Sequence, residues 1–151
     1  MISNWLLSLL NLEPLSWFGL ISATLTGFVF GFERQINAKP IGIRTSVLIV
    51  TSVYVFMAIS LAISKDSLRT IGQIITGVGF LGGGVIISKE GIVQGMTSAA
   101  TIWMITSIGV MIGLQYYTLG LKITFFGLFI QLIFSKIERK FKSLKKGPHR
   151  F

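Results

Sequence analysis

The chain has 151 residues, of which 52% are hydrophobic and only 13% are charged, and its mean hydropathy is +0.77. An ordinary globular domain carries about 25% charged residues, so the expected solvent is lipid. The absence of cysteine excludes disulfides and thiolate metal sites, and a single histidine, His149, excludes histidine-based catalysis. We therefore expect an all-α integral membrane protein that is not an enzyme and holds no cofactor.

The net charge of +9 is not distributed as in a nucleic-acid-binding protein. Seven of the 14 lysines and arginines lie between Lys136 and Arg150, and most of the others occupy short gaps between apolar runs. Membrane proteins place their basic residues in this way. The lipid bilayer is the expected partner, and no nucleic acid is.

The first element in the chain is predicted to be an amphipathic helix over residues 1–13, lying on the membrane surface. Its apolar side chains recur at helical spacing, at Ile2, Trp5, Leu6 and Leu9. A disordered end is the alternative interpretation.

Five segments then have the roughly 20 mostly apolar residues that a spanning helix needs. They cover residues 15–32, 45–63, 70–88, 97–114 and 117–135. With the N-terminus outside, 11 of the 14 basic residues fall on the cytoplasmic side and three outside, which predicts a cytoplasmic C-terminus. A bundle of about five transmembrane helices thus occupies residues 14–135.

Residues 136–151 form a basic cytoplasmic tail that continues the fifth helix. Beside an anionic inner leaflet each basic side chain contributes about 1 kcal/mol of attraction. The tail is interpreted as a membrane anchor, with a partner-binding tail as the alternative.

A weak internal repeat relates the first and third spans. Residues 19–31 resemble residues 72–84 with one residue skipped, and residues 42–46 resemble residues 95–98. Parallel repeats of this kind can place a site near the middle of the membrane. Chance similarity between glycine-rich spans is the alternative.

Residues 77–82, GVGFLG, match the glycine pattern of dinucleotide-binding turns. That reading requires a preceding strand and an acidic residue about twenty positions later, and neither is expected here. Small residues instead allow close contact between membrane helices. The helix-packing set is predicted to be Gly27, Gly31, Gly72, Gly77, Gly79, Gly82, Gly83, Gly84, Gly109 and Gly113. Because Gly72, Gly79 and Gly83 share a face, we expect residues 70–88 to be the central helix; a helix broken at 82–84 and facing an ion is the alternative.

Polar residues in or near the spans indicate a structural or functional role, because placing an ionisable group at the bilayer centre costs about 2.5–3.5 kcal/mol. An outer polar file consists of Asp66, Arg69 and Gln73, which line up on one helical face. This file is either a vestibule or an interfacial salt bridge with one hydrogen bond between helices.

An inner mouth is predicted from polar residues of the two cytoplasmic connections: Glu33, Arg34, Arg44, Thr45, Glu90 and Thr97. A Glu33–Arg44 pair across the first connection is geometrically reasonable. The candidate metal ligands are Glu33, Asp66 and Glu90, and ordinary positive-inside loops are the alternative. No catalytic residues can be assembled.

Four motifs appear in order: GFERQ, KPIGIRT, DSLRTIGQIITGVGFLGGGVI and VQGMTSAATIW. Over about residues 15–115 the chain resembles the membrane domain of the MgtC/SapB family of bacterial inner-membrane proteins. The motif positions are Glu33, Arg34, Gly42, Arg44, Thr45, Asp66, Arg69, Gln73, Gly77, Gly79, Phe80, Gly82, Gly84, Glu90, Gly95, Thr97 and Trp103.

The resemblance implies a multi-pass inner-membrane protein of magnesium homeostasis, ion-stress adaptation and, in pathogens, virulence. It further implies a homodimer that modulates another membrane complex, such as the F-type ATP synthase or a magnesium-transporting ATPase. The alternative is a transporter or channel for Mg²⁺ or another small ion. Departures are Gly83 for alanine, Ser46 for histidine and Gln94 for arginine, and the family's ACT-like C-terminal domain is not expected in this chain.

Overall fold

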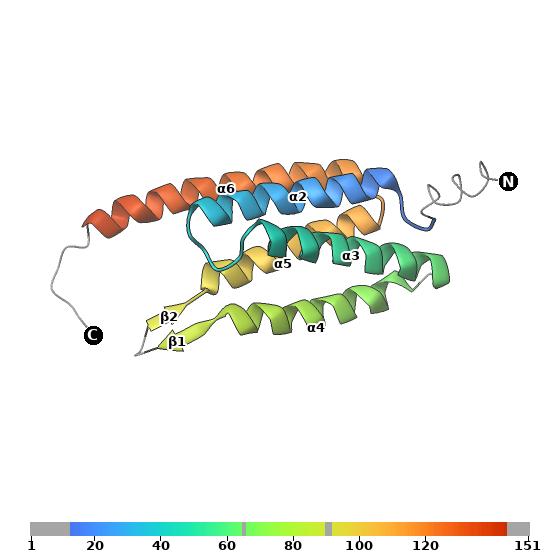
Figure 1. The fold of residues 1–151 in the computed structure, drawn as a ribbon, viewed down its shortest axis with the longest axis horizontal. Helices are drawn as coiled ribbons and strands as arrows, with labels where there is room; N and C mark the ends of the chain where they lie inside the picture. The colour runs from blue at the N-terminus through green and yellow to red at the C-terminus, as the bar shows by residue number, and fades with distance from the viewer. Residues whose placement is uncertain (1–12, 65, 90–91, 145–151) are drawn as a thin grey trace.

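The computed structural model describes residues 13–64, 66–89 and 92–144. Five helices run along one long axis, and a short hairpin lies at one end of the bundle (Figure 1). The elements are α2 (Trp17–Ile36), α3 (Ile43–Ile63), α4 (Ser67–Val85), β1 (Ile87–Lys89), β2 (Ile92–Gln94), α5 (Met96–Gly113) and α6 (Tyr117–Leu144). The prediction of five long helices is confirmed. The amphipathic helix predicted at 1–13 lies almost entirely outside the described residues.

Three of these helices are long and apolar enough to cross a membrane: α3, α5 and residues 117–138 of α6. Helices α2 and α4 are not among them. Each carries polar residues within its length, Glu33 and Arg34 in α2 and Arg69 and Gln73 in α4. Their crossing, and the orientation of the N-terminus outside, stay predictions.

Helix α5 is the centre of the bundle, because it packs against all four other helices. Its isoleucines at 102, 105, 108 and 112 are almost fully buried. Helix α4 buries only Ile74, Val78 and Gly82. The prediction that residues 70–88 form the central helix is therefore wrong. Glycine offers little apolar surface to bury, whereas a row of isoleucines three or four positions apart forms a packing ridge.

Helices α2 and α3 approach each other at glycines. A Cβ added to Gly27 would lie 2.5 Å from the Cα of Val47, and one added to Gly31 would lie 2.5 Å from the Cα of Ile43. Helix α5 approaches α3 in the same way, since a Cβ on Gly113 would collide with the side chain of Met57. Removing the Cβ lets two backbones come into direct van der Waals contact.

Helix α4 ends at Val85, three residues before the predicted end of the third span. Strands β1 and β2 then pair antiparallel, with Ser88 opposite Val93. The turn into α5 is made by Gly95, whose φ is +90° and whose added Cβ would lie 2.1 Å from the carbonyl oxygen of Val85. Only glycine fits this conformation and this space. The expected loop is therefore in part a hairpin.

Candidate functional site

Two charged side chains are buried where α2 meets α5 and α6. The exposed fraction is 8% for Glu33 and 3% for Arg34. One carboxylate oxygen of Glu33 accepts a hydrogen bond from Asn37 Nδ2 at 2.7 Å, and the other accepts one from Gln131 Nε2 of α6. The guanidinium of Arg34 donates to Ser98 Oγ of α5. We call Glu33, Arg34, Asn37, Ser98 and Gln131 the buried polar cluster.

The end of α2 aims these groups at different helices. Neighbouring residues of a helix point about 100° apart, so Glu33 faces α6 while Arg34 faces α5. Asn37 follows Glu33 by four positions, and its amide also donates to the backbone oxygen of Glu33 at 2.8 Å. It thereby satisfies a terminal carbonyl of α2 as well as the carboxylate. The cluster joins three helices through hydrogen bonds to charged groups.

Several buried polar atoms have no hydrogen-bond partner among the described residues. They include Arg34 Nε, Ser46 Oγ and Thr106 Oγ1. Nearer the middle of the bundle, the hydroxyls of Thr26 and Thr124 are 3.1 Å apart and join α2 to α6. Each buried polar atom without a hydrogen bond lowers the stability of the fold by about 1–3 kcal/mol, so other favourable interactions have to offset this cost.

The predicted inner mouth divides into two environments. Glu33 and Arg34 are buried, whereas Arg44, Thr45 and Thr97 are exposed. Glu90 lies outside the described residues. The expected Glu33–Arg44 pair is wrong: the carboxylate is already hydrogen-bonded to Asn37 and Gln131, and no ion pair joins it to Arg44 in the part of the chain that the structure describes.

The outer polar file gathers where α4 begins. The carboxylate of Asp66 accepts the backbone N–H of Arg69 at 3.2 Å and so caps α4. Within the described ranges, no ion pair joins the side chains of Asp66 and Arg69. Gln73 lines a groove between α3 and α4. All three side chains are exposed, and their role as a vestibule stays a prediction.

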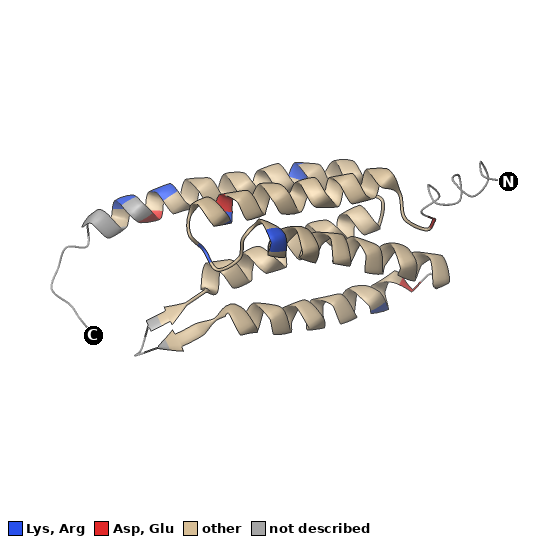
Figure 2. Cartoon of the chain, viewed as in Figure 1, with Lys and Arg blue, Asp and Glu red and all other residues tan. Residues whose placement is uncertain are grey.

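The two candidate metal ligands that the structure describes, Glu33 and Asp66, do not converge. Over residues 13–64, 66–89 and 92–144, no group of three or more His, Cys, Asp or Glu side chains could hold a metal ion. Figure 2 shows acidic positions, in red, at widely separated points along the bundle. Glu33 lies in the last turn of α2, whereas Asp66 is the N-cap of α4, and these two helix ends lie at opposite ends of the bundle (Figure 1). Two such distant carboxylates cannot share one cation. The residues that the structure describes therefore form no pre-assembled Mg²⁺ site.

The glycines of α4 differ from those of α2 and α5, because most of them face open space. A Cβ added to Gly72, Gly77, Gly83 or Gly84 would meet no atom within 4 Å, and one on Gly79 would meet only Trp103 at 4.0 Å. Gly82 alone turns inward, towards Ala99 and Trp103 of α5. Four small residues at helical spacing form one stripe along the outward side of α4, which we call the small face: Gly72, Thr76, Gly79 and Gly83.

Sequence reasoning missed the partners that complete the buried cluster. Ser98 lies in α5, and Thr124 and Gln131 lie in the apolar part of α6, so all three are polar residues within helices apolar enough to cross a membrane. A glutamine in an apolar span is costly unless a neighbouring helix supplies a partner. The cost of Gln131 in an apolar span therefore predicts a polar partner on a neighbouring helix, but it does not identify that partner.

Comparison with known proteins indicates the same protein family as the sequence motifs do. The model of the MgtC family matches residues 20–140, which is most of the chain. The chain belongs to the MgtC family. The match begins within α2, ends within α6 and includes every element between them. No solved structure matches this chain.

Its relatives come from several bacteria. The chain is 36% identical to Protein MgtC of Salmonella typhimurium (strain LT2) over 126 residues, which is 83% of this chain and 54% of that protein. It is 34% identical to Protein SrpB of Synechococcus elongatus over 138 residues, covering 81% of this chain and 76% of SrpB. Protein SapB of Bacillus subtilis is 37% identical over 106 residues, covering 63% and 46% respectively. The chain thus spans about half the length of the MgtC proteins it matches.

Proposed function

We propose that this MgtC-family membrane protein is a non-enzymatic modulator of another membrane complex during magnesium limitation or other ion stress. It works as a homodimer in the bacterial inner membrane. The regulated complex is the F-type ATP synthase or a magnesium-transporting ATPase, the partners that the family resemblance suggests.

The observation that supports docking is the bare small face of α4. The glycines of α2 and α5 already pack against α3, whereas a Cβ added to Gly72 or Gly83 would meet no atom within 4 Å. Lipid tails are as apolar as the side chains they touch, so membrane helices associate through close contact at small residues. A second copy of α4, or a helix of the regulated complex, fits such a surface.

Enlarging the small face tests the dimer. We expect Gly83→Leu to abolish chemical crosslinking between two copies of the purified protein in lipid nanodiscs, because the leucine keeps the two α4 helices apart. The matched control is Gly77→Leu, on the groove side of the same helix, where a Cβ also meets no atom. Equal crosslinking of the two variants and the unaltered protein would show that the small face is not the contact.

A rival function is transport of Mg²⁺ or another small ion, and the buried polar cluster is the observation that favours it. A carboxylate and an unpaired arginine N–H inside a bundle are typical of ion pathways. Against it, both oxygens of Glu33 already accept side-chain hydrogen bonds. A cation would have to displace Asn37 or Gln131 to bind there.

Magnesium flux into liposomes that contain the purified protein separates the two functions. The modulator predicts no flux above that of empty liposomes. Flux that Glu33→Gln abolishes, while dimer crosslinking is unchanged, would establish the transporter and refute the modulator as the primary role.

A further inference from the structure

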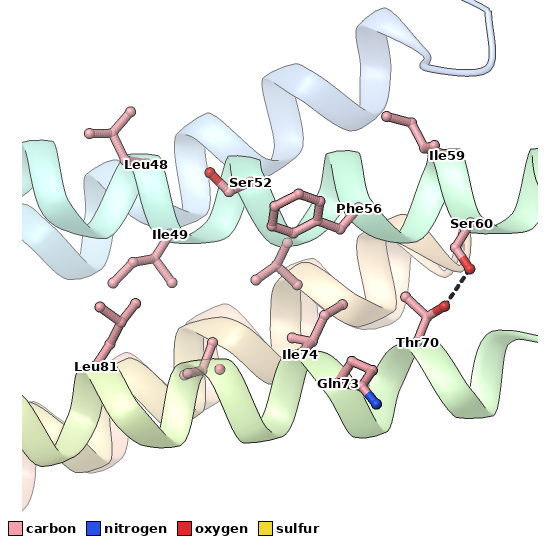
Figure 3. Close-up of a pocket in the computed structure, with 13 residues that line it drawn as sticks. Leu48, Ile49, Ser52, Phe56, Ile59, Ser60, Thr70, Gln73, Ile74 and Leu81 are labelled. Atoms are coloured by element: carbon pink, nitrogen blue, oxygen red, sulfur yellow. Dashed lines mark hydrogen bonds between the residues drawn. The ribbon is translucent and has the colours of Figure 1, made fainter.

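A groove of about 660 Å³ runs between α3 and α4, on the side of α4 that turns away from the small face. Its walls are almost entirely apolar along most of their length, with Leu48 and Phe56 from α3 and Leu81 from α4 (Figure 3). These three side chains are 49–66% exposed in the isolated chain. Since α3 is apolar enough to span the membrane, we expect the groove to face lipid.

Hydrogen-bonding groups gather at one end of this groove. Ser60 of α3 and Thr70 of α4 are hydrogen-bonded to each other there, and Gln73 lies one turn deeper along α4 (Figure 3). Arg69 precedes Gln73 by four positions, so both lie on one side of α4, and both side chains are exposed. The groove is therefore amphiphilic along its length, with hydroxyl and amide groups at a mouth whose Thr70 directly follows Arg69 in the chain, and an apolar interior interrupted only by Ser52.

The length of the groove matches one leaflet. The twelve helical steps from Leu48 to Ser60 cover about 18 Å, at 1.5 Å per residue. The hydrocarbon core of a bilayer is about 30 Å thick, so one leaflet contributes about 15 Å. A spanning helix of a partner would extend well beyond both ends, whereas a single acyl chain would fill the groove and end inside it.

We infer that this groove is a binding site for one phospholipid with an anionic headgroup. One acyl chain lies between α3 and α4, and the headgroup phosphate lies against Arg69 and Gln73. The charge of Arg69 complements the phosphate, and the carboxylate of Asp66 is engaged in capping α4. Because all lipid tails are alike to an apolar wall, the headgroup contacts give the selectivity. The site does not depend on dimer formation, since it lies on the other side of α4.

Photolabelling tests this site on the full chain in nanodiscs of phosphatidylethanolamine. A small fraction of phosphatidylglycerol carries a diazirine at the end of one acyl chain, and mass spectrometry maps the labelled residues. We expect label concentrated on residues 48–56 and 77–81. Gly77→Phe lines the groove and has open space for its ring, so it should lower this label about tenfold, the effect of overpacking a filled site. Gly83→Phe, on the small face, should leave the label unchanged.

Two further variants make the result specific. Ser52→Phe fills the same groove from α3 and should reproduce the loss caused by Gly77→Phe. Arg69→Gln should lower labelling by phosphatidylglycerol about fivefold when unlabelled phosphatidylethanolamine competes, the loss expected for one phosphate contact. Label spread evenly over the lipid-facing side of α6 and insensitive to Gly77→Phe would overturn the proposal. Labelling of the groove residues only after dimers are dissociated would show that the groove is a protein interface, and this result would also overturn the proposal.

Discussion

The contact between α2 and α3 makes a quantitative prediction at Gly27. In Gly27→Ala the new Cβ would lie 2.5 Å from the Cα of Val47 and 2.8 Å from the carbonyl oxygen of Ser46. Carbon atoms pack at about 3.5–4.0 Å, so the two helices must separate by about 1 Å. Forcing an extra methyl group into a packed site costs about 1–3 kcal/mol. Both atoms that it meets belong to the backbone, so no side-chain rotation relieves the clash.

The matched control is Gly83→Ala, where the added Cβ meets nothing within 4 Å. Alanine favours a helix over glycine by about 1 kcal/mol at either position, and this gain cancels when the two variants are compared. The difference of about 1–3 kcal/mol corresponds to roughly 3–10 °C in Tm for a chain of this size.

Thermal unfolding in detergent micelles, followed by circular dichroism, measures that difference. We expect Gly27→Ala to melt below Gly83→Ala by that margin. Equal Tm values for the two alanine variants would refute the reasoning, because they would mean that α2 and α3 separate without cost.

Two other predictions concern buried polar contacts. Glu33→Ala should lower the free energy of unfolding by about 3 kcal/mol, since it removes the acceptor of the Gln131 amide, one of the two hydrogen bonds from Asn37 to Glu33, and the carboxylate next to the charge of Arg34. The exposed Arg44→Ala should change it by less than about 0.5 kcal/mol in the same urea titration, and equal effects would contradict the burial of Glu33. Thr26→Val removes the hydrogen bond to Thr124 and should cost about 1 kcal/mol, whereas an unchanged midpoint would show that the bond contributes nothing.

The number and order of the helices could be predicted from the sequence because each of them coincides with a mostly apolar segment bounded by charged, glycine or proline residues. The bounds of α3 and α5 were predicted within two residues. The end of α4 was not, since Ile86 and Ile87 continue the apolar run and only their backbone pairing distinguishes strand from helix. Apolar composition alone does not distinguish a strand from a helix in a short segment.

The site was harder to predict, because a glycine pattern shows only that a close approach is permitted. Gly27 and Gly79 have the same spacing to a following glycine, yet the first touches the backbone of Val47 and the second meets only the edge of Trp103. Whether a glycine touches a backbone or faces open space depends on the side chains of the helix that lies opposite it. The tertiary arrangement decides which helix that is. The burial of Glu33 was missed for the same reason, since its partner Gln131 lies 98 positions away.

The uneven share of burial among the helices has a consequence for biogenesis. Helix α4 leaves the ribosome before α5, yet α5 supplies most of its contacts, and α4 is not among the helices that are apolar enough to enter lipid by themselves. For a helix α4 that crosses the membrane as the sequence predicts, we therefore expect stable insertion to wait until α5 has been synthesised and can pair with it. The turn at Gly95 brings the end of α4 against the start of α5, so we expect the two helices to insert together as one unit.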